Sequence, residues 1–154
     1  MTEEAKTRAL KLLEKRDLSR QMLLDKLTEK GIAEAEAQEV ADWLCGLGVV
    51  DDRRYAGMVV RHYAARGYGR RRIEQELYRR GIGRPLWDQA MEELPAADDT
   101  VYALLCQKLR GTRALPPDIQ RAQGFLLRRG YSWEEIRAAL DHYRAQNEDD
   151  TRDE

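Results

Sequence analysis

Three segments of this sequence end in the same way, and their spacing constrains the fold more than any other feature. The segments LLDKLTEKGI, RIEQELYRRGI and AQGFLLRRGY reach a glycine at Gly31, Gly81 and Gly130, and a leucine stands four residues before each one. Glycine is typical of a helix C-terminus, because the residue that follows a helix often needs a positive φ, which glycine adopts without a Cβ clash. The intervals of 50 and 49 residues therefore predict an internal repeat of three units.

Each unit predicts three helices. Apolar residues recur at helical spacing along the whole chain, and after each glycine a further amphipathic segment follows, with Val40, Ala90 and Ala139 in matching places. Short units of this kind bury little surface alone and depend on their neighbours. The expected fold is all-α, a tandem array of three three-helix repeats with about nine helices and an elongated shape. The predicted boundaries are 1–48, 49–95 and 96–146.

Capping residues and proline place the helix ends. Ser132 and Glu135 form a capping box, the clearest local signature in the chain, and Pro85 suits a first helical turn. Ser19 is a further expected N-cap, and Asp98 and Asp99 are expected to cap the helix that begins beside them. From residue 147 onward the sequence has no apolar side chain, so an acidic disordered tail is expected over 147–154. The predicted helices cover about 3–15, 19–31, 33–44, 51–67, 70–81, 84–94, 98–110, 117–129 and 132–146.

Charge is distributed unevenly, although the formal net charge is only -1. Residues 51–95 carry ten basic and seven acidic side chains, whereas residues 1–50 carry eight and ten, and residues 96–154 carry nine and eleven. A protein that binds duplex DNA on its own is usually basic throughout, because neutralising phosphates supplies most of the affinity. Strong autonomous DNA binding is therefore not the first expectation.

The positive charge is concentrated in the middle repeat, where eight arginines lie between Arg61 and Arg84 against two acids, Glu74 and Glu76. Arginine-rich helix faces are often ordinary solvated surface with some i,i+4 pairing. Here the excess of one sign favours an anionic partner. The candidate binding residues lie on two predicted helices and the Gly67-Tyr68-Gly69 corner between them: Arg54, Arg61, Arg66, Tyr68, Arg70, Arg71, Arg72, Gln75, Tyr78, Arg79 and Arg80.

Helical phase predicts which of these side chains face solvent. Met58 and Tyr63 fall on the apolar stripe of the first of these helices, and Ile73 and Leu77 form the buried edge of the second. Tyr68 and Tyr78 are expected outside as anchors in an interface. Arg66 and Arg80 lie nearer the buried edges of their helices. The other arginines of the stretch share an outward phase.

Motifs for catalysis or metal binding are absent from the sequence. It has no P-loop, no dinucleotide-binding glycine pattern and no nucleophile elbow, and Cys45, Cys106, His62 and His142 have no metal-ligand spacing. We therefore expect no enzyme activity, no cofactor and no metal site. Two isolated cysteines, an acidic N-terminus and the lack of a long apolar run predict a cytoplasmic protein without a membrane span.

The central block resembles the RecX family of bacterial regulators of the RecA recombinase. The likeness rests on Leu47-Gly48-x-Val50-Asp51-Asp52-x-x-Tyr55-Ala56, Val60-Arg61, Gly67-x-Gly69 and Ile73-x-x-Glu76-Leu77-x-x-x-Gly81-Ile82. The third repeat adds Phe125-Leu126-x-x-Arg129-Gly130-Tyr131-Ser132 and Ile136, and the first repeat matches by pattern. Arg70 departs from the family, which often has proline there. This removes a helix-start signal and adds charge.

The resemblance implies a crescent of tandem three-helix units that binds RecA and its nucleoprotein filament. It also implies that the protein restrains filament growth, ATP hydrolysis, strand exchange and co-protease activity, and so modulates DNA repair and the SOS response. DNA, single- or double-stranded, is a second candidate partner, and a monomer is expected because no heptad seam is present. Two other interpretations are a helix-turn-helix-like DNA-binding module that acts without RecA, and a passive helical-repeat scaffold.

Overall fold

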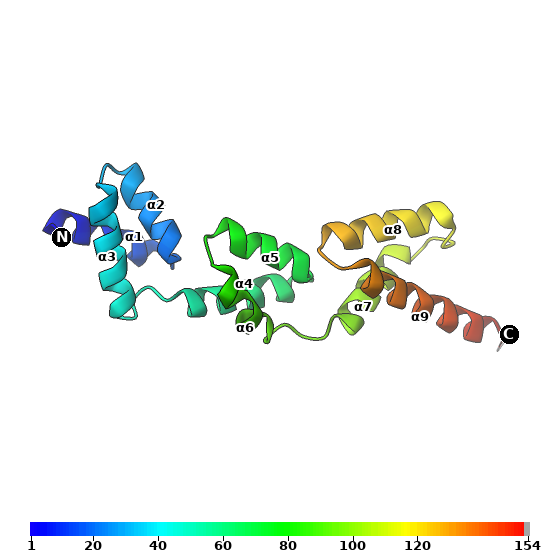
Figure 1. Ribbon diagram of the computed structural model, residues 1–154. Helices are drawn as coiled ribbons and strands as arrows, with labels where there is room; N and C mark the ends of the chain where they lie inside the picture. Colours follow the sequence, from blue (N-terminus) through cyan, green and yellow to red (C-terminus); the bar gives the residue numbers. More distant parts are fainter. Residues whose placement is uncertain (153–154) are drawn as a thin grey trace. The chain divides into compact units, whose positions relative to one another are not determined.

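A computed structural model describes residues 1–152, and within this range it contains nine α-helices, one short 3-10 helix and no β-strand (Figure 1). This confirms the predicted all-α array of three-helix repeats. The helices are α1 (Glu3–Lys15), α2 (Arg20–Glu29), α3 (Glu34–Gly46), α4 (Asp52–Ala65), α5 (Arg70–Arg79), η1 (Arg84–Leu86), α6 (Trp87–Met91), α7 (Ala97–Leu109), α8 (Pro116–Arg128) and α9 (Trp133–Arg152).

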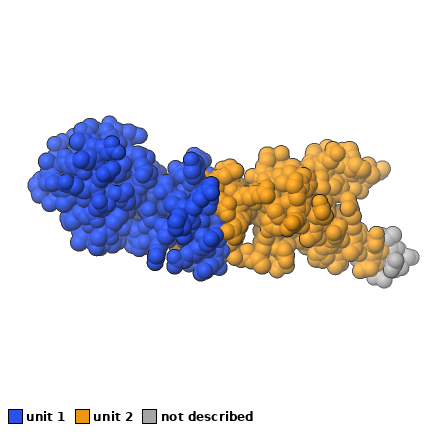
Figure 2. All heavy atoms as spheres, viewed as in Figure 1, with its two compact units in different colours: residues 1–60, 76–93 blue, residues 61–75, 94–154 orange. Residues whose placement is uncertain are grey.

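The backbone groups into two compact units (Figure 2). Unit 1 consists of residues 1–60 and 76–93, and unit 2 consists of residues 61–75 and the chain from residue 94 onward. The division runs through α4 and α5, so the two ends of each of these helices belong to different units. Each unit is described by itself below.

Unit 1 is built on the packing of α1, α2 and α3 around one apolar core (Figure 1). Ala5 and Ala9 are fully buried on α1, because their small side chains allow the helix to lie close to its neighbours. Ser19 begins α2 as predicted, since its side chain accepts a hydrogen bond from the Met22 N–H at 3.2 Å. The largest buried side chains of this core are Leu23, Leu27, Val40 and Leu44.

Unit 2 has its core between α7, α8 and α9. The predicted capping box at the start of α9 is confirmed: the Ser132 N–H donates to Glu135 Oε1 at 2.9 Å, and the Glu135 N–H donates to Ser132 Oγ at 3.2 Å. Tyr131 and Ile136, on either side of this box, are both buried. The remaining core side chains are Val101, Leu105, Leu109, Ala122, Leu126, Ala139 and Leu140.

The three glycine stops share one hydrogen-bond pattern, as the repeat predicts. At each stop the residue after the glycine donates its N–H to the carbonyl of the leucine four residues before the glycine, at 3.1, 3.0 and 3.2 Å. The glycines have φ values of 92°, 75° and 98°. A Cβ atom is disfavoured in this left-handed region, which explains why glycine recurs. The stops are Gly31, Gly81 and Gly130.

Several local expectations are wrong. The helix predicted over 84–94 is shorter than expected: Pro85 lies in its first turn as predicted, but residues Arg84–Leu86 form a 3-10 turn and α6 ends at Met91. Asp98 and Asp99 lie inside the first turn of α7 and do not cap it. Met58, expected in the buried stripe of α4, is 38% exposed.

The acidic segment after residue 146 also differs from the prediction. Helix α9 continues through Arg152, because neither proline nor glycine interrupts it and the charged residues there tolerate a helix. Residues 153–154 of the expected tail lie outside the described residues. Among the helices that the structure describes, none has the length and apolar character needed to cross a membrane.

Candidate interaction surface

The predicted binding residues lie on α4, on α5 and on the corner that joins them. Among these side chains Tyr68, Arg72 and Arg80 are partly buried. The others are exposed to solvent: Arg54, Arg61, Arg66, Arg70, Arg71, Gln75, Tyr78 and Arg79. Because α4 and α5 each contribute to both units, the two parts of this candidate surface are described in turn.

In unit 2 the exposed guanidinium groups surround the end of α4 and the start of α5. Arg70 Nε lies 2.8 Å from Glu74 Oε1, in an i,i+4 pair at the surface. The guanidinium groups of Arg66 and Arg71 make no hydrogen bond or ion pair with any residue in the described part of the chain. Arg66 was expected nearer a buried edge and is exposed instead. These two side chains are therefore available to an anionic partner.

Tyr68 does not project outward as predicted. Its ring is partly buried between two cations, with the guanidinium carbon of Arg129 at 4.5 Å and that of Arg72 at 5.7 Å from the ring centroid. The ring of Tyr63 meets it edge-on, at a centroid distance of 5.5 Å. Helical phase did not place Tyr68 correctly, because the residue lies in a turn where the 3.6-residue period does not apply. Its aromatic faces are used inside the protein.

Backbone hydrogen bonds hold the Gly67–Gly69 corner against the glycine stop of the third repeat. The Gly69 N–H donates to the Arg129 carbonyl at 2.7 Å, and the Arg71 N–H donates to the Gly130 carbonyl at 3.2 Å. Arg129 Nη1 also donates to the carbonyl of Arg66 at 2.7 Å. The predicted corner thus serves as a joint between repeats, and its N–H groups are already used.

Tyr131 completes this joint. Its hydroxyl donates to the Gly67 carbonyl at 2.7 Å. Burial raises the pKa of Tyr131 to about 12, and the Glu135 carboxylate adds to this increase, while Arg129 opposes it. The phenol therefore remains protonated, and able to donate, at neutral pH.

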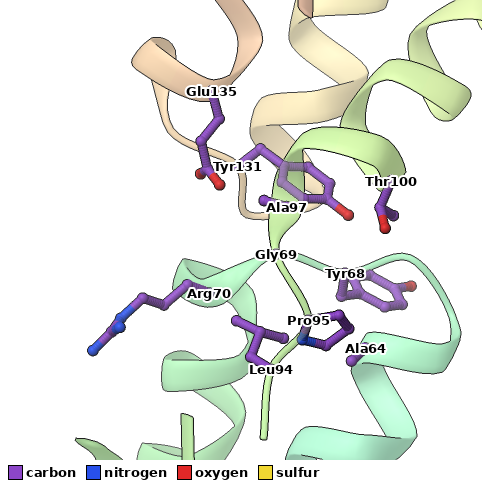
Figure 3. A pocket seen from close by; sticks show the side chains of 10 residues that line it. All are labelled: Ala64, Tyr68, Gly69, Arg70, Leu94, Pro95, Ala97, Thr100, Tyr131 and Glu135. Atoms are coloured by element: carbon purple, nitrogen blue, oxygen red, sulfur yellow. The ribbon is translucent and has the colours of Figure 1, made fainter. Parts of the chain in front are cut away.

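The space beside the joint is small. Ten residues line a pocket of about 30 Å³, enough for a water molecule (Figure 3). They come from α4, the corner, the start of α5, the segment before α7, α7 itself, and the start of α9 with the residue Tyr131 that precedes it. Figure 3 shows the rings of Tyr68 and Tyr131 at this pocket, whereas the Arg70 side chain extends away from it. A pocket of this volume does not fit an organic cofactor.

In unit 1 the arginines at the end of α5 are tied to a buried acid. Glu76 is only 3% exposed, and its carboxylate lies 3.1 Å from Arg79 and 3.5 Å from Arg80. Arg80 also donates to the Tyr55 hydroxyl at 2.7 Å, which fits its expected position at the buried edge. Arg79 has a 71% exposed side chain, so it still presents charge to solvent. Tyr78 is 72% exposed and meets the expectation of an outward aromatic ring.

Contacts within the protein therefore reduce the number of predicted arginines that are available to a partner. Arg70, Arg79 and Arg80 contact carboxylates, and Arg72 lies over Tyr68. Arg54 donates to the Val49 carbonyl at 3.1 Å but remains exposed. The strongest remaining candidates for contact with an anion are Arg54, Arg66, Arg71 and Arg79.

The remaining titratable side chains form no metal site among the residues whose side chains the structure describes, because no group of three or more His, Cys, Asp or Glu side chains there could hold a metal ion. Cys45 and Cys106 are both free and partly buried, and burial raises the pKa of the Cys45 thiol. His62 and His142 are exposed, although partly buried positions were expected.

The fold and the surface together define a class: tandem three-helix repeat proteins that present cationic helix faces. Models of the three RecX domains match in order, the first three-helix domain over residues 5–44, the second over 51–91 and the third over 97–140. Relatives named regulatory protein RecX include one from Vibrio campbellii, 33% identical over 90% of this chain and 91% of its own length. Another, from Trichlorobacter lovleyi, is 36% identical over 84% of this chain and 88% of its own length.

Solved structures agree with the sequence relatives. The crystal structure of RecX from Lactobacillus salivarius superposes with a TM-score of 0.80 at 20% identity, covering 90% of this chain and 94% of that one. A second crystal structure, of a regulatory protein RecX, gives a TM-score of 0.81 at 24% identity over 90% of this chain and 72% of that one. The chain belongs to the RecX family.

Sequence reasoning overlooked the role of Arg129. This residue precedes Gly130 as Arg80 precedes Gly81. The Arg129 side chain reaches back to the Arg66 carbonyl in the preceding repeat, whereas the Arg80 side chain bonds to Tyr55 within its own repeat, so the alignment of the two arginines does not predict the role of Arg129.

Proposed function

We propose that this chain is a non-enzymatic regulator of RecA that binds the RecA nucleoprotein filament. It inhibits the ATPase, strand-exchange and co-protease activities of the filament, and thereby modulates DNA repair and the SOS response. Membership in a family whose relatives are named regulatory proteins supports this proposal. The protein acts as a monomer in the cytoplasm, with residues 1–48, 49–95 and 96–146 as its three working repeats.

One observation of the surface carries the mechanism. Arg66 and Arg71 are exposed on either side of a corner that is held in place by hydrogen bonds from the third repeat. A fixed corner presents guanidinium groups without a further loss of backbone entropy on binding. Such groups attract a polyanion and can form charge-assisted hydrogen bonds with phosphate or carboxylate oxygens. The filament, which contains DNA phosphate and protein carboxylates, offers both.

The test reverses two charges that have no internal ion pair. In Arg66→Glu/Arg71→Glu, the concentration needed to inhibit single-strand-dependent RecA ATPase should rise by at least about tenfold, equivalent to about 1.4 kcal/mol. The control, Arg137→Glu/Arg144→Glu, makes the same change in net charge at exposed positions of α9 and should inhibit normally. Circular dichroism should show unchanged helical content in both variants. Full inhibition by the first variant would remove this surface from the mechanism.

Salt dependence and DNA binding separate this proposal from the alternatives. Filament binding through guanidinium groups should weaken steeply as salt rises, whereas a passive scaffold that binds through apolar grooves should show little change. A helix-turn-helix-like module should bind duplex DNA with sequence selectivity in the absence of RecA. Fluorescence anisotropy with labelled duplexes of different sequence measures that activity directly.

A further inference from the structure

The repeats are joined by one recurring contact, in which the glycine stop of one repeat lies on the helix start of the repeat before it. In unit 2 the stop at Gly130 lies on the start of α5, where the N–H groups of Gly69 and Arg71 donate to the stop. A Cβ atom added to Gly130 would lie less than 3.0 Å from the backbone nitrogen of Arg72. The joint is therefore tightly closed over this glycine.

Unit 1 contains the same contact one repeat earlier. Here the stop at Gly81 lies on the start of α2, and the Ser19 hydroxyl donates to the carbonyl of Arg80. A Cβ atom on Gly81 would lie less than 3.0 Å from the side chain of Gln21. Ser19 and Gly69 occupy the same place in their repeats, directly before the middle helix. Both joints thus receive the first turn of an α-helix.

The first stop has the same local structure but no helix start lies on it. Gly31 is exposed, and a Cβ atom added there would meet no atom within 4 Å. A groove of about 620 Å³ opens beside it, against α1 and the end of α2. Arg8 Nη1 donates to the Lys30 carbonyl at 3.1 Å, and this carbonyl matches those of Arg80 and Arg129 that accept hydrogen bonds in the closed joints. The residues lining the groove are Arg8, Lys11, Leu12, Glu14, Lys15 and Lys30.

The charge of the groove indicates what it can bind. Four of the six lining side chains are cationic and one is acidic, although residues 1–50 as a whole have more acids than bases. Lys11 and Lys15 are exposed, and neither makes an ion pair with another residue in the described range. Arg8 is paired with Glu4 at 3.1 Å. The groove therefore favours an anionic occupant.

We propose that the Gly31 stop and this groove form a docking surface for the first turn of an α-helix of a partner protein, a turn that carries Asp or Glu. The two internal joints show that a helix start fits a stop of this kind. Acidic residues are favoured at a helix start by the helix dipole, and they would face the lysines of the groove. The proposal goes beyond the regulation described above, because it assigns a protein-binding role to the first repeat.

A second copy of this chain does not offer a matching helix start from its third repeat. The middle helix of the third repeat, α8, begins with Pro116 and Pro117, which have no N–H groups to donate. The N–H of Leu115 already donates to Asp118 Oδ2 at 3.1 Å. Pro117 therefore lacks the donor that Arg71 supplies in the closed joint, and the Leu115 N–H, in the place of Gly69, is already used. Head-to-tail growth of the array is disfavoured, and the occupant is a different protein.

The test uses the full chain and a labelled synthetic helical peptide of about 16 residues that begins Ser-Pro-Glu-Glu. An isomeric peptide carries the two glutamates in its last turn. Fluorescence anisotropy at low salt should show tighter binding of the acidic-start peptide. Lys11→Glu/Lys15→Glu should weaken that binding about tenfold or more, and Lys11→Gln/Lys15→Gln should weaken it less. The charge-matched control Arg137→Glu/Arg144→Glu should bind the peptide as the unmodified chain does.

Three outcomes would overturn the proposal. Equal binding of the two peptides, or equal binding by the charge-reversed chain, would show that the groove does not select an acidic helix start. If the binding of a labelled oligothymidylate depended more strongly on Lys11 and Lys15 than the binding of the peptide does, the groove would be assigned to nucleic acid. Self-association in sedimentation experiments that is lost in Lys11→Glu/Lys15→Glu would assign it to a second copy. Because no RecA is present, these results are independent of the proposed regulation.

Discussion

Replacing Gly130 or Gly31 by alanine measures how much the contact between repeats contributes to the free energy of unfolding. The two glycines end equivalent helices, share the same hydrogen-bond pattern and have similar φ values, 98° and 92°. They differ in their surroundings, because Gly130 is covered by the start of α5, whereas the space at Gly31 is open. Any difference in stability between Gly130→Ala and Gly31→Ala therefore reports on the contact.

The magnitude follows from the contacts at each site. An alanine forced to a positive φ costs about 1 kcal/mol in both variants. At Gly130 the methyl group would also push the joint apart, which weakens the hydrogen bonds from Gly69 and Arg71, worth about 1 kcal/mol each, and adds about 1–3 kcal/mol of overpacking. We expect a loss of about 1 kcal/mol for Gly31→Ala and about 3–6 kcal/mol for Gly130→Ala.

Urea unfolding of the full chain, followed by far-ultraviolet circular dichroism, measures both losses. Gly111→Ala is a suitable control, because Gly111 has a φ of 78° and no atom within 4 Å of an added Cβ, so it should behave like Gly31→Ala. If Gly130→Ala and Gly31→Ala lost equal stability, within about 0.5 kcal/mol, the contact at Gly130 would not hold the repeats together.

Two further predictions concern buried polar groups. Because the pKa of Tyr131 is raised from 10.0 to about 12, its neutral form stabilises the fold below pH 10 and this contribution is lost as pH rises toward 12. Tyr131→Phe should cost about 1–3 kcal/mol near neutral pH, because it leaves the Gly67 carbonyl without its donor. Between pH 10 and 12 the stability of this variant should fall less than that of the unmodified chain. Urea unfolding at a series of pH values measures both effects. Glu76→Gln should cost about 2 kcal/mol, because it removes the buried charge that is paired with Arg80. Glu74→Gln, at the surface, should cost only about 0.3 kcal/mol. Equal losses of stability in thermal unfolding would contradict this difference in burial.

The sequence predicted the repeat because its signals are local. A glycine that follows a helix, with a leucine one turn earlier, requires only the geometry of its own chain segment. The capping box at Ser132 and Glu135 is equally local and was confirmed. Helix phase placed Ile73 and Leu77 in the buried edge of α5 correctly, and both are fully buried.

The errors occurred where distant residues decide the outcome. Tyr68 was expected outside, but Arg129, far along the chain, covers its ring. Glu76 was counted only as one of two acids among the arginines, and its burial was not predicted. Neither outcome is visible in a helical wheel, because each depends on a neighbouring repeat or on a turn. The candidate surface was therefore predicted as a group of residues, while its internal pairing could not be.

The glycine stops also show that equivalent sequence does not predict equivalent surroundings. Gly31, Gly81 and Gly130 are equivalent in sequence, and the structure gives all three the same hydrogen-bond pattern. Each of the later two meets a helix start from the repeat before it, whereas no helix start lies on the first stop within the described residues. In the same range no stop lies on the start of α8, where Pro117 lacks an N–H donor. The stop at Gly31 lies beside a cationic groove, so of the three stops it is the one that is suited to receive another protein.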